Sequence, residues 1–171
     1  VIVDEYVDGE LIGPLTLRVT RRETFPGGAE AVARHANAAG VPVTMTLPHC
    51  ARAARKTRYY GPDGLLCQID EVDSAPLSLL IAEHCAAALR ATATDAVICA
   101  DYRHGVFHAE SLETLKAAVP EGALRVADSQ VASRWGNILD FAGFDLVTPN
   151  EREARWATGL QDAAAAALPA R

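Results

Sequence analysis

Short apolar segments alternate with amphipathic segments along most of the chain. The apolar segments are rich in β-branched residues and lack a regular alternation of apolar and polar positions, which is typical of parallel strands covered on both faces. Segments with apolar residues at helical spacing lie between them, as in a doubly wound α/β domain. The predicted strands are Val1–Val3, Val41–Met45, Ala96–Ala100, Leu124–Ala127 and Asp145–Thr148.

Four predicted helices are bounded by residues that commonly begin or end helices. Ser and Asn favour the position before the first turn, and glycine favours the left-handed position after the last turn. On these signals we predict helices over Ala29–Ala39, Ser74–Arg90, Ser111–Ala118 and Asn150–Thr158. Gly40 and Gly159 follow the first and the last of them.

Two further segments have the pattern of antiparallel hairpins. Glu10–Phe25 contains a turn at Gly13-Pro14, and Arg55–Val72 contains a turn at Gly61-Pro62-Asp63-Gly64. Residues of these types form tight turns between neighbouring antiparallel strands. We therefore predict one α/β domain over residues 1–171, with a mostly parallel sheet and a small β appendage over residues 8–25 and 55–72.

Composition and charge limit the function classes. The 171 residues are 50% hydrophobic and 22% charged with a net charge of −6, which excludes a disordered chain and a globally basic surface for nucleic acid. No apolar run reaches the roughly 20 residues that a membrane span needs. Four cysteines lack metal-ligand spacing, and Cys85 and Cys99 lie in apolar segments, so we expect buried thiols in a reducing cytoplasm. The missing initiator Met and the C-terminal alanine run lead us to expect a fragment of a longer protein.

Polar residues follow four of the predicted strands. They are Asp4, Asp101-Tyr102, Asp128-Ser129 and Thr148-Pro149-Asn150. Each one alone is more simply explained as a turn or helix-cap residue. Because ligands of open parallel sheets bind beyond the carboxyl ends of the strands, the four together predict a binding site at one edge of the sheet.

Two local features fit a ligand that carries hydroxyl groups or phosphate. Gly27-Gly28 precede a predicted helix, where free N–H groups meet the positive end of the helix dipole, although such helix entries are common. Asn150 and Glu153 lie on one helical turn. A carboxylate at this place could hold a Mg²⁺-bound water, but acidic residues are also common at helix starts for reasons of stability alone. Neither GxGxxG nor a P-loop motif is present.

A basic run has two interpretations. No acidic residue lies between Glu30 and Asp63, and the segment carries Arg34, Arg52, Arg55, Lys56 and Arg58. These cations suit a substrate phosphate, but a solvated face is the more usual explanation. The five histidines show no metal-ligand spacing, and we interpret His35 and His84 as ordinary surface or core residues.

The motifs of this chain, taken in their order along the sequence, resemble those of the ribokinase family of carbohydrate kinases. The D-x-Y-x-x-G, A-D-Y-x-x-G and T-P-N-x-x-E segments are most similar to the heptose-7-phosphate kinase branch, the kinase half of the bifunctional enzyme of ADP-heptose synthesis. The matching segments span nearly the whole chain: Asp4-Glu5-Tyr6-Val7-Asp8-Gly9, Pro26-Gly27-Gly28-Ala29, Lys56-Thr57-Arg58-Tyr59, Asp101-Tyr102-Arg103-His104-Gly105, Asp128-Ser129 and Thr148-Pro149-Asn150-Glu151-Arg152-Glu153.

The resemblance implies a three-layer α/β/α ribokinase-like fold with a small β lid, and phosphoryl transfer from ATP with Mg²⁺ to a hydroxyl of a sugar or sugar phosphate. It also implies a homodimer formed through the lid, with no nucleic-acid or membrane partner. The roles implied for individual residues are substrate binding by Asp4, Gly27, Gly28, Lys56, Arg58 and Asp101, nucleotide binding by Asp128 and Asn150, and metal binding by Glu153.

Several departures from the family pattern qualify these expectations. Ala31 stands where the family usually has a sugar-binding Asn, and Gln130 stands where a basic residue is common. The Gly-Ala-Gly-Asp motif, which supplies the catalytic Asp base in this family, is absent, so we expect that base beyond Arg171 and an inactive chain. The alternatives are a sugar- or nucleotide-binding remnant without catalysis and a Rossmann-like binding module unrelated to kinases.

Overall fold

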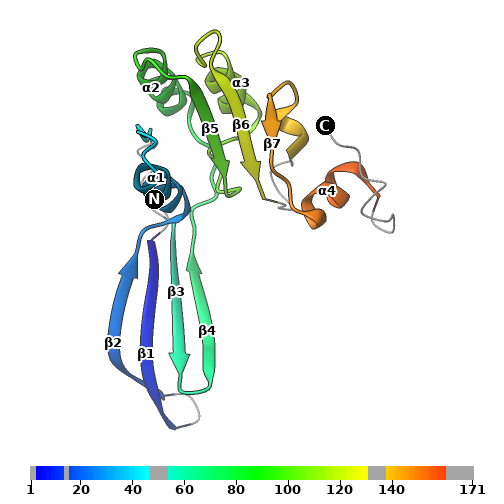
Figure 1. The fold of residues 1–171 in the computed structure, drawn as a ribbon. Coiled ribbons are helices and arrows are strands. Elements are labelled where there is room, and N and C mark those ends of the chain that lie inside the picture. The colour runs from blue at the N-terminus through cyan, green and yellow to red at the C-terminus, as the bar shows by residue number, and fades with distance from the viewer. Residues whose placement is uncertain (1–2, 14–15, 47–53, 131–137, 161–171) are drawn as a thin grey trace. The chain divides into compact units, whose positions relative to one another are not determined.

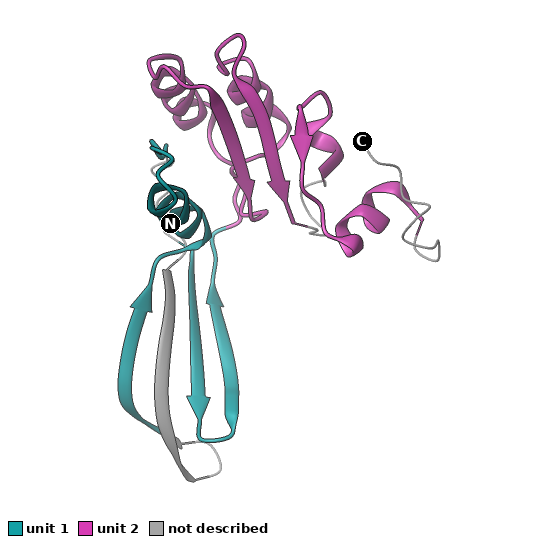
Figure 2. Ribbon diagram, in the orientation of Figure 1, with its two compact units in different colours: residues 1–73 teal, residues 74–171 magenta. Residues whose placement is uncertain are grey.

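The computed structural model describes residues 3–13, 16–46, 54–130 and 138–160 (Figure 1), with only the backbone for residues 3–13 and 16. The chain divides into two compact units, residues 1–73 and 74–171 (Figure 2). Each unit contains a β-sheet of its own. Sheet A, in unit 1, has four strands in the order β2-β1-β3-β4, and sheet B, in unit 2, has three strands in the order β5-β6-β7.

Sheet A consists of two hairpins joined side by side. Strand β1 (Val3–Gly13) pairs antiparallel with β2 (Thr16–Phe25), and β3 (Arg55–Gly61) pairs antiparallel with β4 (Gly64–Glu71). Strands β1 and β3 pair in parallel and hold the hairpins together (Figure 1). The antiparallel pairing predicted for both segments is therefore confirmed, and Pro14 of the first predicted turn lies outside the described residues.

The expected first strand is wrong in its extent. Val1 and Ile2 lie outside the described residues, and β1 continues to Gly13 instead of ending at Val3. Asp4 consequently lies inside a strand, between Phe25 of β2 and Lys56 of β3, and does not follow a strand of the parallel sheet. Backbone pairing on both sides holds this acidic segment extended, because strand formation depends more on neighbouring strands than on residue type.

Helix α1 (Gly28–Ala38) confirms the first predicted helix, and Gly40 follows it with a left-handed φ of 82°. The strand predicted over Val41–Met45 is wrong, because residues 41–46 are irregular. Its backbone donors bond back to the end of α1: the Val41 N–H donates to the Ala36 carbonyl at 3.0 Å and the Val43 N–H to Asn37 Oδ1 at 3.1 Å. Pro42 removes a further ladder donor.

The three strands of sheet B are parallel, as predicted. Strand β5 (Ala96–Asp101) pairs with β6 (Leu124–Ser129), which pairs with β7 (Leu146–Val147). Strands β5 and β6 extend one and two residues beyond the predicted apolar runs, and β7 is shorter than predicted. The helical elements of unit 2 are α2 (Leu79–Arg90), α3 (Ala109–Lys116), the 3₁₀ helix η1 (Ile138–Phe141) and α4 (Glu151–Thr158).

Two of the predicted helix starts are displaced. Helix α2 begins after Ser78, whose Oγ accepts the Ile81 N–H at 3.5 Å, and not after Ser74. The preceding residues instead bond to the segment before α3: the Leu77 N–H donates to the Gly105 carbonyl at 2.9 Å. Helix α3 begins two residues earlier than predicted, because the Ser111 Oγ accepts the His108 N–H at 3.2 Å inside the first turn.

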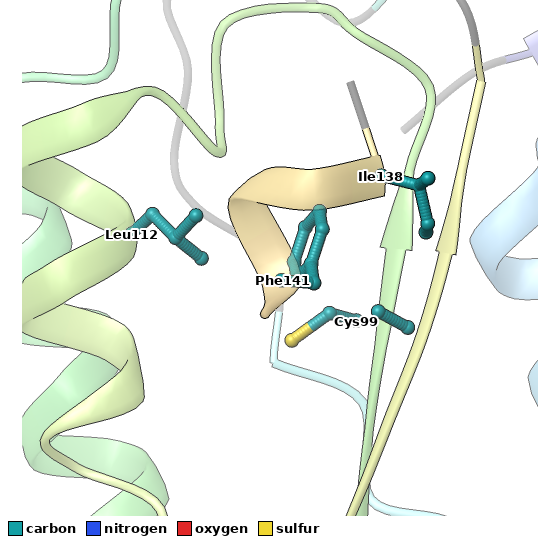
Figure 3. Close-up of a cluster of buried hydrophobic side chains, with 5 residues drawn as sticks. Cys99, Leu112, Ile138 and Phe141 are labelled. Carbon is teal, nitrogen blue, oxygen red and sulfur yellow. The ribbon is translucent and has the colours of Figure 1, made fainter. Parts of the chain in front are cut away.

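One face of sheet B carries the core of unit 2. Cys99 of β5 and Ala127 of β6 meet Leu112 of α3 and the η1 residues Ile138 and Phe141 (Figure 3). Helix α3 and η1 thus cover this face. On the other face of the sheet, Ile98, Leu124 and Leu146 are each about half exposed within the part of the chain that the structure describes. The mixed α/β class with a parallel sheet is confirmed.

Candidate functional site

The predicted site residues of unit 2 lie at the carboxyl edge of sheet B. Ala100 of β5 is the register partner of Asp128 in β6, and Asp101 is the partner of Ser129. Val147, the last residue of β7, pairs with Ala127, so the chain leaves β7 beside Asp128. The three parallel strands therefore end together and bring Asp101, Asp128 and the segment that leads to Asn150 to one edge, as predicted. The prediction is wrong for Asp4, which lies within β1 of sheet A.

Asp128 presents an exposed carboxylate at this edge. The Thr148 hydroxyl donates to Asp128 Oδ1 at 2.9 Å, and the Thr148 N–H donates to the Ala127 carbonyl at 3.1 Å. Burial raises the pKa of the neighbouring Tyr102 phenol, and the negative charge of Asp128 raises it further. The edge thus combines a neutral phenol, a hydroxyl and an accessible carboxylate, which are groups that bind ligand hydroxyls.

Asn150 and Glu153 close the N-terminus of α4 together. Asn150 Oδ1 accepts the Glu153 N–H at 3.0 Å, and Glu153 Oε2 accepts the Asn150 N–H at 2.8 Å. This reciprocal pair is a capping box, so the simpler interpretation of an acid at a helix start accounts for one oxygen of each side chain. The same bonds fix the Glu153 carboxylate in one orientation, five residues after Thr148 in the chain.

The acidic groups of the site fit a lightly coordinated cation. Among the residues that the structure describes, no group of three or more His, Cys, Asp or Glu side chains is placed to hold a metal ion. Mg²⁺ commonly takes one or two carboxylates and completes its shell with water and substrate phosphate. Glu153 therefore suits a magnesium ion that arrives with a polyphosphate, whereas an all-protein metal cage does not fit the described residues.

Asp101, predicted to contact substrate, is buried in an internal network. Asp101 is 3% exposed. Its Oδ1 accepts the Arg103 N–H at 2.7 Å, and its Oδ2 accepts the Ser129 hydroxyl at 3.0 Å. Burial raises the pKa of Asp101 more than the Arg103 hydrogen bond and charge lower it. These contacts favour a structural part for Asp101 at the edge.

Sequence reasoning missed Arg103, which is the centre of this network. It is 5% exposed and has a left-handed φ of 57°. Arginine is rarely buried, and nothing in the A-D-Y-x-x-G pattern distinguishes a buried Arg103 from a solvated one. The spacing of an acid at the end of a strand and an Arg two residues later was the only available signal.

In unit 1, the predicted phosphate-binding cations are already paired along sheet A. Lys56 Nζ lies 3.2 Å from Asp70 Oδ2, and Arg58 Nε donates to Gln68 Oε1 at 2.9 Å. Slight burial raises the pKa of Asp70. The hydrogen bonds from Lys56 and Gln68 lower the pKa by more, so it lies below its ordinary value. Asp4 is the strand partner of Lys56, so these residues lie on adjacent strands.

Gly27 and Gly28 form the start of α1, as predicted. Gly27 is the buried N-cap residue with an extended backbone, and no side chain caps the helix there. Ala31, three residues after Gly28, is exposed. The basic residue Arg34 pairs with Glu30 on the same helix at 2.6 Å, which fits the solvated interpretation of that part of the basic run.

Three cysteines and two histidines of the described residues lie outside the predicted site. Cys85 and Cys99 are buried free thiols, as predicted, and Cys67 is exposed on β4. Burial raises the pKa of Cys99 to about 12, so this thiol stays protonated. His35 and His84 are exposed on helices. No helix in the described ranges is long and apolar enough to cross a membrane.

Comparison with known proteins gives one relative by sequence and several by fold. The chain is 30% identical over 111 residues to the bifunctional protein HldE of Pelobacter propionicus, a match that covers 64% of this chain and 22% of that protein. No family model matches the chain. The chain therefore spans about a fifth of the length of this relative.

Solved structures that are similar in fold include phosphofructokinase-2 and a carbohydrate kinase. The tetrameric inhibited form of phosphofructokinase-2 from Escherichia coli matches with a TM-score of 0.59 at 17% identity, over 92% of this chain and 60% of that chain. The same enzyme in complex with fructose-6-phosphate gives 0.57 at 18% identity, over 92% and 61%. A carbohydrate kinase from Agrobacterium tumefaciens gives 0.55 at 19% identity, over 94% and 61%.

Proposed function

We propose, on the premise that this chain resembles the ribokinase-family carbohydrate kinases in sequence and fold, that the protein transfers a phosphoryl group from ATP to a hydroxyl of a sugar or sugar phosphate. Within that class we propose a substrate like heptose 7-phosphate, because the D-x-Y-x-x-G, A-D-Y-x-x-G and T-P-N-x-x-E segments resemble those of the heptose kinase branch.

One observation carries the proposal. The segments that contain Asp101, Asp128 and Thr148 lie far apart in the sequence but end at the same edge of sheet B. There Thr148 bonds to Asp128, and the Asn150-Glu153 cap follows directly. The carboxyl edge of a parallel sheet is where open α/β folds bind ligands. The agreement between family motifs and edge geometry supports a nucleotide site at this place.

The proposed roles follow from the groups at the edge. Asp128 and Asn150 bind the nucleotide, and Glu153 holds the magnesium ion through its second carboxylate oxygen or through water. Phosphoryl transfer depends chiefly on positioning and charge neutralisation, which bound Mg²⁺ supplies at the phosphate oxygens. The capping box keeps Glu153 in place before the ligand binds, so little ordering cost remains at that step.

Residues of unit 1 are proposed to bind the sugar. Asp4 and the Gly27-Gly28 backbone bind its hydroxyls, and Lys56 with Arg58 binds its phosphate. Because Asp70 holds Lys56 at 3.2 Å, a substrate phosphate has to compete with this carboxylate for the same ammonium group. Such competition favours a doubly charged phosphate over a neutral sugar. Asp101 is buried with Arg103 and Ser129 in unit 2, so the part proposed for it is structural.

A binding remnant without catalysis is the second candidate. Ala31 occupies an exposed position on α1 where the family usually has a sugar-binding Asn, and the 171 residues contain no Gly-Ala-Gly-Asp segment. A chain without the base that this segment supplies binds nucleotide or sugar but transfers no phosphate. Phosphoryl transfer by a longer gene product that includes the Gly-Ala-Gly-Asp segment supports the kinase, and binding without transfer supports the remnant.

Sheet A is proposed as the contact between two copies of the protein. Cys67 and Ile69 lie on one face of β4, and both are exposed. On the opposite face of the same strand lie Gln68 and Asp70, which pair with β3 cations. An apolar face on a sheet with open edges favours self-association.

A reducing cytoplasm is the compartment that we propose, because Cys67, Cys85 and Cys99 are thiols outside any disulfide.

Isothermal titration of the chain with Mg²⁺-ATP, paired with an ADP-release assay on the longer gene product, tests the proposal. We expect ATP binding that weakens about ten-fold or more in Asp128→Asn and Glu153→Gln, since charge-assisted hydrogen bonds contribute roughly 1.5–3 kcal/mol each. Glu113→Gln, a helix glutamate whose side chain is 74% exposed, is the matched control. Binding without turnover of heptose, hexose or pentose phosphates supports the remnant, and absence of binding of both Mg²⁺-ATP and these sugar phosphates refutes both candidates.

A further inference from the structure

Arg103 occupies a position that is costly for an arginine. Its side chain is 2% exposed, and its backbone φ is 57°, in the left-handed region that L-residues other than Asn and Asp seldom adopt. A buried guanidinium is tolerated only when its donors are satisfied. The surroundings therefore have to compensate both the burial of the charge and the backbone conformation.

The compensating contacts come from three separate elements. The Arg103 Nε lies 3.0 Å from Asp101 Oδ2 at the end of β5, and Nη1 donates to Asp140 Oδ2 in η1 at 3.1 Å. Nη2 donates to the Ser129 hydroxyl at 2.6 Å, and Nε donates to the Gln130 carbonyl at 3.1 Å. One planar group thus binds the ends of β5 and β6 and the helix that covers them.

The contacts on β6 bear directly on Asp128. Successive side chains of a strand point to opposite faces, so a fixed Ser129 side chain sets the direction of the Asp128 side chain. Arg103 and Asp101 hold the Ser129 hydroxyl from both sides, and the Gln130 N–H donates to the Asp101 carbonyl at 3.1 Å. Asp128 itself makes its bond to Thr148, away from the buried network.

We propose that Arg103 is a positioning residue for Asp128. By holding Ser129 and Gln130 it fixes the end of β6, and Asp128 is thereby presented at the sheet edge in the orientation that binds the nucleotide. This inference rests on the proposed nucleotide site. It adds to that proposal a buried residue that touches no ligand and acts through the main chain of β6.

The substitution Arg103→Met keeps a long side chain and removes all guanidinium donors. Arg103→Lys keeps the charge without the fork, and Ser129→Ala removes only the hydroxyl that links Arg103 to Asp101. The matched control is Leu112→Ala, a core change at a residue that is 3% exposed and lies outside the network. It lowers the stability of unit 2 without altering a contact of β6 with Arg103.

Two measurements separate positioning from simple loss of stability. The rate of amide hydrogen exchange at residues 128–130 measures how firmly the end of β6 is held in the absence of ligand. The rates in the network variants are compared with those in Leu112→Ala under conditions in which the variants have equal stability. Titration with Mg²⁺-ATP reports the presentation of Asp128. We expect faster exchange at residues 128–130 and about ten-fold or more weaker binding in Arg103→Met, with Ser129→Ala affected in the same direction and Arg103→Lys between Met and the parent.

Each outcome decides one of the two claims. Parental exchange at residues 128–130 in Arg103→Met and Ser129→Ala overturns the positioning inference, as does parental ATP affinity in either folded variant. Equal weakening of ATP binding by Leu112→Ala also overturns it, because the effect is then one of general stability. If the parent chain itself binds no ATP, the proposed function fails, and the exchange data alone still show whether Arg103 fixes the end of β6.

Discussion

Removing the ring of Phe141 is expected to destabilise unit 2 strongly. Phe141 is 1% exposed, and its ring centroid lies 5.7 Å from that of Phe107 and 5.3 Å from that of Phe144, both in edge-to-face arrangements. Truncation of a buried phenylalanine to alanine costs about 3–5 kcal/mol. Two edge-to-face pairs at about 0.5–1.5 kcal/mol each account for part of this loss.

The loss is large against the stability of an ordinary domain, which is about 5–15 kcal/mol. Urea denaturation followed by circular dichroism measures it. With an m-value of about 1–3 kcal/mol/M, Phe141→Ala lowers the midpoint by roughly 1 M or more. Leu80→Ala, at a helix position that is 83% exposed, is the control and is expected within about 0.5 kcal/mol of the parent.

The result that refutes this reasoning is a loss below about 1 kcal/mol for Phe141→Ala, the size of an average surface or minor core change. Such a result means that the ring does not hold η1 against sheet B. It also weakens the case for Arg103, because η1 carries Asp140, the partner of the Arg103 Nη1.

Two further predictions concern glycine and cysteine positions. Gly105→Ala places a Cβ 2.2 Å from the Ala75 carbonyl oxygen at a φ of 80°, whereas Gly143→Ala meets nothing within 4 Å at a φ of 88°. Urea denaturation is expected to show a loss of about 1–2 kcal/mol for Gly143→Ala from the left-handed backbone, and a clearly larger loss for Gly105→Ala. Iodoacetamide at pH 8 is expected to modify exposed Cys67 and to spare Cys99, because burial raises the pKa of Cys99 to about 12 and only the thiolate reacts. Equal losses for the two glycines, or rapid labelling of Cys99 in the folded chain, contradict these predictions.

The parallel part of the fold was predictable because its signals are local. The apolar runs of β5 and β6 lie near their predicted places, and the polar residues that follow them mark the sheet edge. The end of α4 could also be read from the sequence, since Gly159 adopts a left-handed φ of 71°. In each of these cases a local feature of the sequence is enough to predict the local backbone structure.

The wrong predictions arose where hydrogen-bond partners outside the segment decide its structure. Val41–Met45 has strand-forming residues, but its N–H groups bond to the end of α1. The acidic residues of Val3–Gly13 argue against a strand, yet two neighbouring strands hold that segment extended. Ser74 and Ser78 are equally good cap residues, and the hydrogen bond from Leu77 to Gly105 selects the second.

The candidate site was predictable as a set of residues and not as a set of contacts. Motif order indicates that Asp128 and Asn150 belong together, and the structure places both at one edge. The exchange of hydrogen bonds between Asn150 and Glu153 follows from their spacing alone. Burial of Asp101 with Arg103 does not, because it requires Ser129 and Asp140 from elements 26 and 37 residues later in the chain.

The parallel pairing of β1 with β3 has a consequence for the order of folding. Each hairpin of sheet A closes over a turn of a few residues, but Val3 pairs with Arg55. Contacts between such distant residues form slowly, because closing a long loop has to precede the pairing. We therefore expect the pairing of β1 with β3 to be a late step in the folding of sheet A, with the inner edge of the first hairpin unpaired until the second hairpin has formed.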